Sequence, residues 1–179
     1  MTQQPELRRF RVNEGLFTAV SAGFFLLLVG VIFVITPNLF QGIIDFFNGF
    51  TLNQAVPHSS GLYLPVPEHL AQHTTVYTAA GQFSLVWGIF QIVILAFRFI
   101  AGSHGSKTSE TVGNVIFSLG TAYLINLLLT GPMLSPQTRG LENWFVFWAT
   151  IIVLLGVSLI ARGLVLAVYF WYPIRRKTA

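Results

Sequence analysis

Four long apolar runs constrain this chain more than any other feature of its sequence. The runs cover approximately residues 15–36, 77–100, 111–130 and 144–172. A helix rises about 1.5 Å per residue, so roughly 20 apolar residues cross the hydrocarbon core of a bilayer, which is about 30 Å thick. The sequence therefore predicts an all-α integral membrane protein, a four-transmembrane-helix bundle that forms one membrane domain from residue 1 to residue 179.

The composition agrees with this fold class and excludes several others. Only 9% of the residues are charged and 54% are hydrophobic, whereas a soluble domain carries about 25% charged residues. The pI is about 9.9, but the basic residues flank the apolar runs, so we expect no nucleic-acid partner. The chain has no cysteine, which excludes disulfide exchange and cysteine-ligated metal clusters. No histidine lies within a span, so bis-histidine haem is excluded and no cofactor is expected.

Lysine and arginine lie mostly on one side of the predicted membrane. Eight of them fall in the two terminal tails or near the loop between the second and third spans: Arg8, Arg9, Arg11, Arg98, Lys107, Arg175, Arg176 and Lys177. The loop 37–75 holds none, and the loop after the third span holds only Arg139. Cytoplasmic loops carry the excess of basic residues. The sequence therefore predicts a multi-pass protein of the plasma membrane with both termini in the cytoplasm.

The predicted outer loop 37–75 begins with an amphipathic segment. Thr36 and Pro37 form a helix-start signal. The apolar residues that follow recur at helical spacing: Leu39, Phe40, Ile43, Ile44, Phe46, Phe47 and Phe50. This pattern predicts a short interfacial amphipathic helix over about residues 37–49. Such a helix either braces the bundle or offers a lid or docking surface. Residues 51–67 show no helical pattern and are expected to be irregular or extended.

Histidines in the same loop form the candidate metal site. Pro67 is expected to open a helix, on which His69 and His73, four residues apart, share one face. Glu68 is adjacent, and His58 lies earlier in the loop. Paired imidazoles one turn apart bind a divalent metal when a third ligand is available. The alternative is a set of solvated interfacial histidines, which is the simpler interpretation because this spacing often occurs by chance.

Polar residues inside the spans support two interpretations. The second span carries a seam of mostly small or polar residues, Gly81, Ser84, Gly88, Gln91 and Arg98, and the fourth carries Ala149, Gly156 and Gly163. Small residues let helices approach closely, and polar side chains in lipid need a protein partner. Helix packing is the first interpretation. The second is a polar path lined by Ser84, Gln91 and Asn126. The third span is the most polar, so we expect protein to enclose it most.

Charged residues near the cytoplasmic ends of the spans suggest a cluster. Glu14 and Glu110 begin the first and third spans, and Arg98 and Arg162 lie at or inside the ends of the second and fourth. We expect these four side chains either to meet at the inner face and fix the cytoplasmic end of the bundle, or to extend separately toward the lipid headgroups.

Three stretches of the chain resemble a known group of proteins. They are residues 10–25 with their continuation at 35–40, residues 75–80, and residues 144–149. Together they resemble uncharacterised small four-span membrane proteins that recur in archaeal genomes. The resemblance spans most of the chain. It implies the four-span topology and supplies neither an activity nor site residues.

Three functions are consistent with these features. The first is a non-enzymatic subunit or scaffold of a membrane complex, because catalytic equipment is lacking and small-residue seams and a phenylalanine-rich outer helix are present. It implies other membrane subunits or self-association, within a lipid bilayer. The alternative is a small oligomeric carrier or channel with a polar path along the second and third spans. The third is an outer-face metal site.

Overall fold

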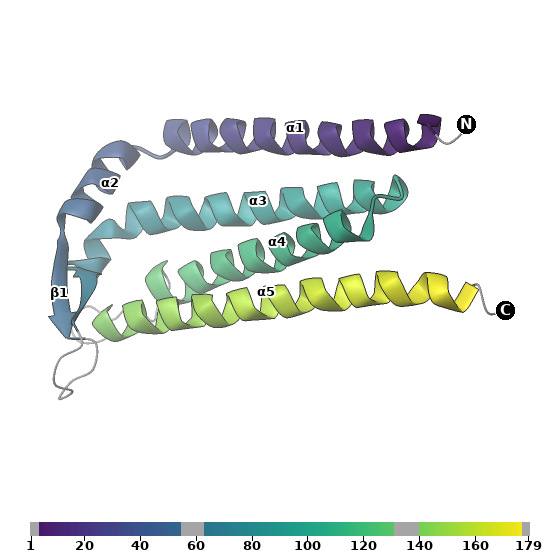
Figure 1. Ribbon diagram of the computed structural model, residues 1–179. Coiled ribbons are helices and arrows are strands. Elements are labelled where there is room, and N and C mark those ends of the chain that lie inside the picture. Colours follow the sequence, from purple (N-terminus) through teal and green to yellow (C-terminus); the bar gives the residue numbers. More distant parts are fainter. Residues whose placement is uncertain (1–3, 55–62, 131–139, 177–179) are drawn as a thin grey trace.

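The computed structural model describes residues 4–54, 63–130 and 140–176, with side chains described within 15–52, 63–130 and 142–171. The fold is mostly helical (Figure 1). Its elements, in chain order, are α1 (Gln4–Ile35), α2 (Leu39–Asn48), β1 (Phe50–Gln54), β2 (Tyr63–Pro67), the 3-10 helix η1 (Leu70–His73), α3 (Thr74–Ile100), α4 (Gly105–Leu124), the π-helical segment η2 (Ile125–Thr130) and α5 (Gly140–Arg176).

Four helical segments are long and apolar enough to cross a membrane, as the sequence predicts. They are Gly15–Ile35, Leu70–Ile100, Gly105–Thr130 and Glu142–Trp171. The third begins earlier than the predicted residue 111, because α4 includes the polar turns that precede the apolar run. In these turns hydroxyl side chains donate to backbone carbonyls of the same helix. Thr111 Oγ1 donates to the Lys107 carbonyl at 2.9 Å, and Ser109 Oγ donates to the Ser106 carbonyl at 2.8 Å.

The long helices form an open row (Figure 1). α1 packs against α3, α3 against α4, and α4 against α5. Across the described residues, no contact of similar extent joins α1 to α4 or α5, or α3 to α5. The predicted bundle is therefore one layer of helices with two open flanks.

Glycines set the closest approaches in this row. A Cβ placed on Gly88 of α3 would lie 2.6 Å from Leu119 Cδ2 of α4, and one placed on Gly120 of α4 would lie 2.5 Å from Leu154 Cδ1 of α5. The predicted packing seam of the second span is thus present at Gly88. The packing seam predicted in the fourth span is not found among the described residues, because a Cβ on Gly156 or Gly163 would meet nothing within 4 Å. Those glycines lie on a face of α5 turned away from α4.

Aromatic rings hold α1 to the row. Phe24 of α1 stacks on Phe90 of α3 with ring centroids 3.9 Å apart, and Phe25 meets Phe83 edge to face at 5.5 Å. The other described side chains of α1 are largely exposed: 11% of the most apolar window within Gly15–Ile35 is buried. The corresponding share in α4 with η2 is 33%. The expectation that protein encloses the third span most is therefore confirmed.

We call the end of the row that carries α2, β1 and β2 the hairpin end, and the opposite end, where α3 turns into α4, the terminal end. At the hairpin end β1 and β2 pair antiparallel, with Phe50 opposite Pro67. The sequence predicts that residues 51–67 are irregular or extended. Where the structure describes them, they are extended and form this hairpin. Val66 is fully buried, and Trp144 Nε1 of α5 donates to the Pro65 carbonyl at 3.3 Å. A two-stranded hairpin is marginally stable alone, so packing on α5 stabilises it.

Candidate functional site

The histidine region at the hairpin end does not form the predicted helix. Pro67 is the last residue of β2, and the Glu68 N–H donates to the Gly49 carbonyl at 2.8 Å, which extends the strand pairing. His69 therefore precedes η1, whereas His73 ends it, so the prediction that the two histidines share a helix face is wrong.

Nor do the described residues assemble a metal site. His73 lies edge to face with the Phe46 ring, their centroids 5.3 Å apart, and Asp45 and His69 are close enough to act on it electrostatically. Within residues 4–54, 63–130 and 140–176, no three His, Cys, Asp or Glu side chains form a group that could hold a metal ion. The remaining candidate ligand, His58, lies outside the described residues.

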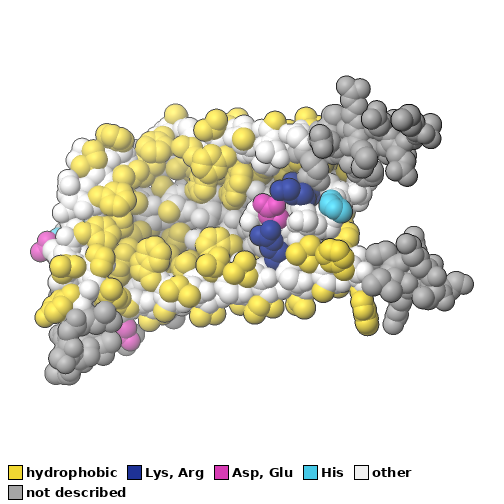
Figure 2. Space-filling model, viewed as in Figure 1, with side chains coloured by type: hydrophobic (Ala, Val, Ile, Leu, Met, Phe, Trp, Pro, Cys, Tyr) yellow, Lys and Arg dark blue, Asp and Glu magenta, His cyan; other side chains and the backbone are white. Residues whose placement is uncertain are grey.

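The charged residues at the terminal end come together in part. Arg98 and Arg162 both lie close enough to act electrostatically on Glu110, and Figure 2 shows basic side chains on both sides of an acidic one at this end. The ion pair of Glu110 is with Lys107, at 2.9 Å. The side chain of Glu14 lies outside those described.

Arg98 also makes two contacts that the sequence did not predict. Its Nη1 donates to the Lys107 carbonyl at 2.7 Å, and its guanidinium lies 5.7 Å from the ring centroid of Phe17 in α1. Arg98 therefore ties the end of α3 to the first turn of α4. Lys107 was missed as a site residue, although its spacing of three residues from Glu110 on one helix indicates such a pair.

The three polar residues expected along one path are separated. Ser84 and Gln91 belong to the face of α3 that carries Gly81 and Gly88 toward α4, and Gln91 is only 6% exposed. Neither residue reaches the cavity described below. Asn126, in contrast, lines that cavity.

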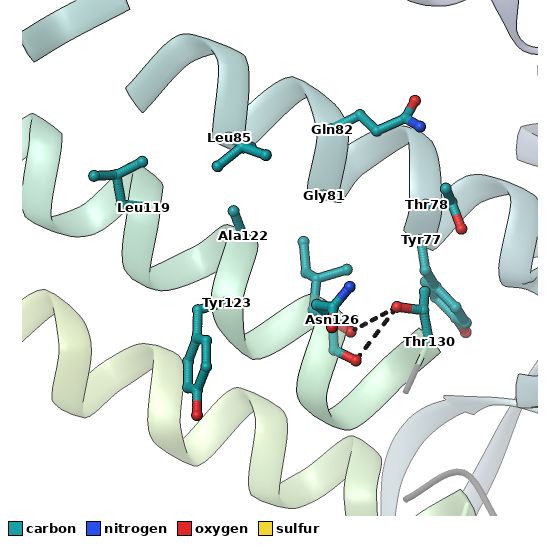
Figure 3. A pocket seen from close by; sticks show the side chains of 11 residues that line it. Tyr77, Thr78, Gly81, Gln82, Leu85, Leu119, Ala122, Tyr123, Asn126 and Thr130 are labelled. Carbon is teal, nitrogen blue, oxygen red and sulfur yellow. Dashed lines mark hydrogen bonds between the residues drawn. The ribbon is translucent and has the colours of Figure 1, made fainter. Parts of the chain in front are cut away.

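A cavity of about 370 Å³ opens on one flank of the row, between α3 and the α4–η2 segment. Figure 3 shows its apolar floor and its polar edge. Its lining residues are Tyr77, Thr78, Gly81, Gln82, Leu85, Leu119, Ala122, Tyr123, Ile125, Asn126 and Thr130. We call this surface the α3–α4 flank. Thr78, Gln82 and Leu85 share a face of α3 through their helical spacing, but this spacing alone does not indicate which face borders the cavity.

Two exposed amides lie at similar depth on this flank. A Cβ on Gly81 would be 3.2 Å from Ile125 Cγ2, so these two residues lie at one level. Gln82 and Asn126 are each the next residue, and because α3 and α4 run in opposite directions their levels differ by about 3 Å, less than one helical turn. Gln82 is eight residues beyond the start of α3, roughly 12 Å along the helix. Both side chains are exposed, and neither makes a hydrogen bond with another described residue. Polar side chains without a hydrogen-bond partner among the described residues thus lie within the apolar segments Leu70–Ile100 and Gly105–Thr130, toward the hairpin end.

The backbone is irregular beside these amides. Ile125–Thr130 is π-helical, and Thr130 Oγ1 lies within hydrogen-bond distance of two carbonyls, 3.5 Å from that of Ile125 and 3.4 Å from that of Asn126. Single π turns inside α-helices are rare and often accompany functional sites. Cavity, amides and π turn coincide here, which makes the α3–α4 flank the candidate functional site.

The chain matches no protein-family model, and neither the curated proteins nor the solved structures include one similar to it. The class is therefore defined by the fold and the site themselves: a mostly helical chain with four helices able to span a membrane and one polar flank.

Proposed function

We propose that the chain is a multi-pass protein of the plasma membrane, with the terminal end in the cytoplasm and the hairpin end outside. The split of lysine and arginine along the sequence supports this orientation. Amphipathic α2 lies in the outer interface of the membrane: Phe40 and Phe47 are 68% and 67% exposed, and Gln41 bonds Asp45 at 2.9 Å on the polar side. Exposed phenylalanines beside a polar face are typical of helices lying in the headgroup region.

Single cysteines test the orientation, because the chain has none of its own. Asn48→Cys lies at the end of α2, and His104→Cys lies in the turn between α3 and α4; both positions are exposed. In intact cells, a membrane-impermeant maleimide is expected to label the first variant and to label the second only after lysis. The reverse pattern would show that the orientation is wrong.

The function that this geometry supports best is that of a non-enzymatic subunit or scaffold of a membrane complex. The observation that carries it is the pair of exposed amides, Gln82 and Asn126, on the α3–α4 flank. Moving an amide into hydrocarbon without a hydrogen-bond partner costs about 4–8 kcal/mol, and lipid chains offer no partner. Polar side chains on transmembrane helices are instead satisfied by neighbouring helices. Another membrane-embedded protein covering this flank would satisfy both amides.

Native mass spectrometry of the protein, gently extracted from its membrane, tests this function. We expect a complex larger than the single chain of 19.9 kDa, and we expect Gln82→Leu with Asn126→Leu to release it. Asn48→Leu is the control, because it removes an exposed amide of α2 that lies outside the cavity and outside the four long apolar segments. A wild-type chain that is always alone would refute the proposal.

A small oligomeric carrier is the second candidate, favoured by one observation: Asn126 and Thr130 give the cavity a polar edge. A path would need to continue from this cavity past Gln91, which is buried against other side chains. A second chain would be required to enclose it, because the four long helices form an open row. Substrate flux that is lost in Asn126→Leu but kept in Asn48→Leu would favour the carrier.

A further inference from the structure

We propose that the partner at the α3–α4 flank is a second copy of this chain, related to the first by a twofold axis along the membrane normal. This inference rests on the proposed function, since it names the protein that covers the flank. The hydrogen-bonding chemistry of the exposed amides, their depth and the shape of the surface around them support a second copy.

The chemistry of the exposed groups is self-complementary. A side-chain amide carries two N–H donors and a carbonyl acceptor, so an amide pairs with a second amide as well as with any other polar group. In a twofold contact the same patch meets itself, and residue i of one copy meets residue j of the other in both directions. Gln82 and Asn126 meet this requirement. A patch of donors alone, such as lysine side chains, would repel its own copy.

The depth of the amides favours the same partner. Two copies of one chain insert with the same topology, so a twofold axis along the membrane normal brings equal depths together. Gln82 and Asn126 of one copy then face the same two amides of its neighbour, inside the apolar segment. A different membrane protein would need its own polar groups at that level, and lipid chains carry none there.

The shape of the flank also fits a copy of itself. A twofold contact needs a projection and a recess on one surface, and here Tyr123, 66% exposed, stands at the rim of the cavity. Figure 3 shows Leu85, Leu119 and Ala122 between the two helices, where they form an apolar floor. Tyr123 from the neighbouring copy can pack on this floor while its hydroxyl reaches the polar edge.

The chain's own first helix does not cover this surface. α1 contacts α3 through Phe83 and Phe90, whereas the cavity is lined by Thr78, Gln82 and Leu85. These two sets of residues lie on different faces of α3 by their helical spacing. The α3–α4 flank is therefore open to a neighbour while the contact with α1 stays intact.

Cysteine cross-linking in the native membrane tests the proposal. Gln82→Cys, Tyr123→Cys and Asn126→Cys are treated separately with a short membrane-permeant bis-maleimide. The matched control is Leu26→Cys on α1, which is 70% exposed and lies near the level of Gln82, because its neighbour Phe25 contacts Phe83. We expect a product of twice the 19.9 kDa chain mass from the flank variants and none above background from the control.

Two further outcomes separate this inference from the proposed function. If the flank variants cross-link to a chain of another mass, the second copy is wrong but the subunit function holds. If they give no product above the control and native spectra contain only single chains, both proposals fail. Cross-linking through Tyr123→Cys is also measured in a chain that carries Gln82→Leu and Asn126→Leu. We expect the dimer product to be lost in this variant. An undiminished yield of dimer would overturn the role of the amides.

Discussion

Replacing Gly88 by alanine tests how tightly α3 and α4 are packed. A Cβ at this position would lie 2.6 Å from Leu119 Cδ2, 2.8 Å from Leu119 Cγ and 3.3 Å from the Leu119 backbone nitrogen. Rotating the leucine side chain moves Cδ2 and Cγ, but the contact with the backbone nitrogen at 3.3 Å remains, and the displaced side chain needs new space in the packed contact. The two helices must therefore separate by some tenths of an ångström along their contact line.

The expected change in the free energy of unfolding follows from two opposing effects. Alanine stabilises a helix interior relative to glycine by about 0.5–1 kcal/mol, and forcing an extra carbon into a packed interface costs about 1–3 kcal/mol. Gly156→Ala isolates the first effect, because a Cβ there meets nothing within 4 Å. We therefore expect Gly88→Ala to be less stable than Gly156→Ala by about 1–3 kcal/mol. Gly120→Ala should fall between them, since its neighbours are flexible Leu154 side-chain atoms.

Equilibrium unfolding of the detergent-solubilised protein measures these differences, with tryptophan fluorescence as the signal from the four tryptophans of the chain. The free energy of unfolding is compared between the single variants under one set of conditions. Equal stability of Gly88→Ala and Gly156→Ala would refute the packing argument, because it would mean that α3 and α4 are not held at the described separation.

Three further substitutions have expected outcomes. Trp144→Phe removes the hydrogen bond to the Pro65 carbonyl and should lower the free energy of unfolding by about 0.5–1.5 kcal/mol, with faster proteolysis of the hairpin as a second readout. Arg98→Met removes the charge-assisted bond to the Lys107 carbonyl and should cost about 1.5–3 kcal/mol in the same unfolding assay; no change would show that the bond does not join α3 to α4. Lys107→Ala breaks the exposed ion pair with Glu110 and should cost only about 0.2–0.5 kcal/mol, an effect that disappears in high salt.

The four long helices could be predicted because apolar length is a local property of the sequence. The close contact at Gly88 was also predictable, since a small residue seven positions after Gly81 lies on the same helix face. The equivalent spacing of Gly156 and Gly163 was misleading. Small residues permit close approach, but which face meets a neighbour depends on how α5 is rotated against α4.

The hairpin could not be predicted because its stability is not local. Pro65 and Pro67 interrupt the alternating pattern that identifies a strand, and the buried Val66 is covered by residues distant in the chain. The same reason explains the error at Pro67, where strand pairing with Phe50 prevails over a helix-start signal.

The polar flank was found only in part from the sequence. Asn126 was singled out as a polar residue within a span, and Gln91 was expected beside it on the same grounds. The structure buries Gln91 and exposes Gln82. Distinguishing the two requires knowing the direction from which α4 approaches α3, and the pattern of a single helix does not contain that information.

The bond between Trp144 and Pro65 joins residues 79 positions apart, and this separation orders the events of biosynthesis. The ribosome completes α1, α2, both strands, α3 and α4 before Trp144, which donates to the hairpin, is made. During that interval the two strands have only marginal stability of their own. The contact of Trp144 with the hairpin therefore forms last, after the start of α5 has been made, and a chain that stops after η2 would lack the part of the hydrophobic cluster around Val66 that α5 supplies.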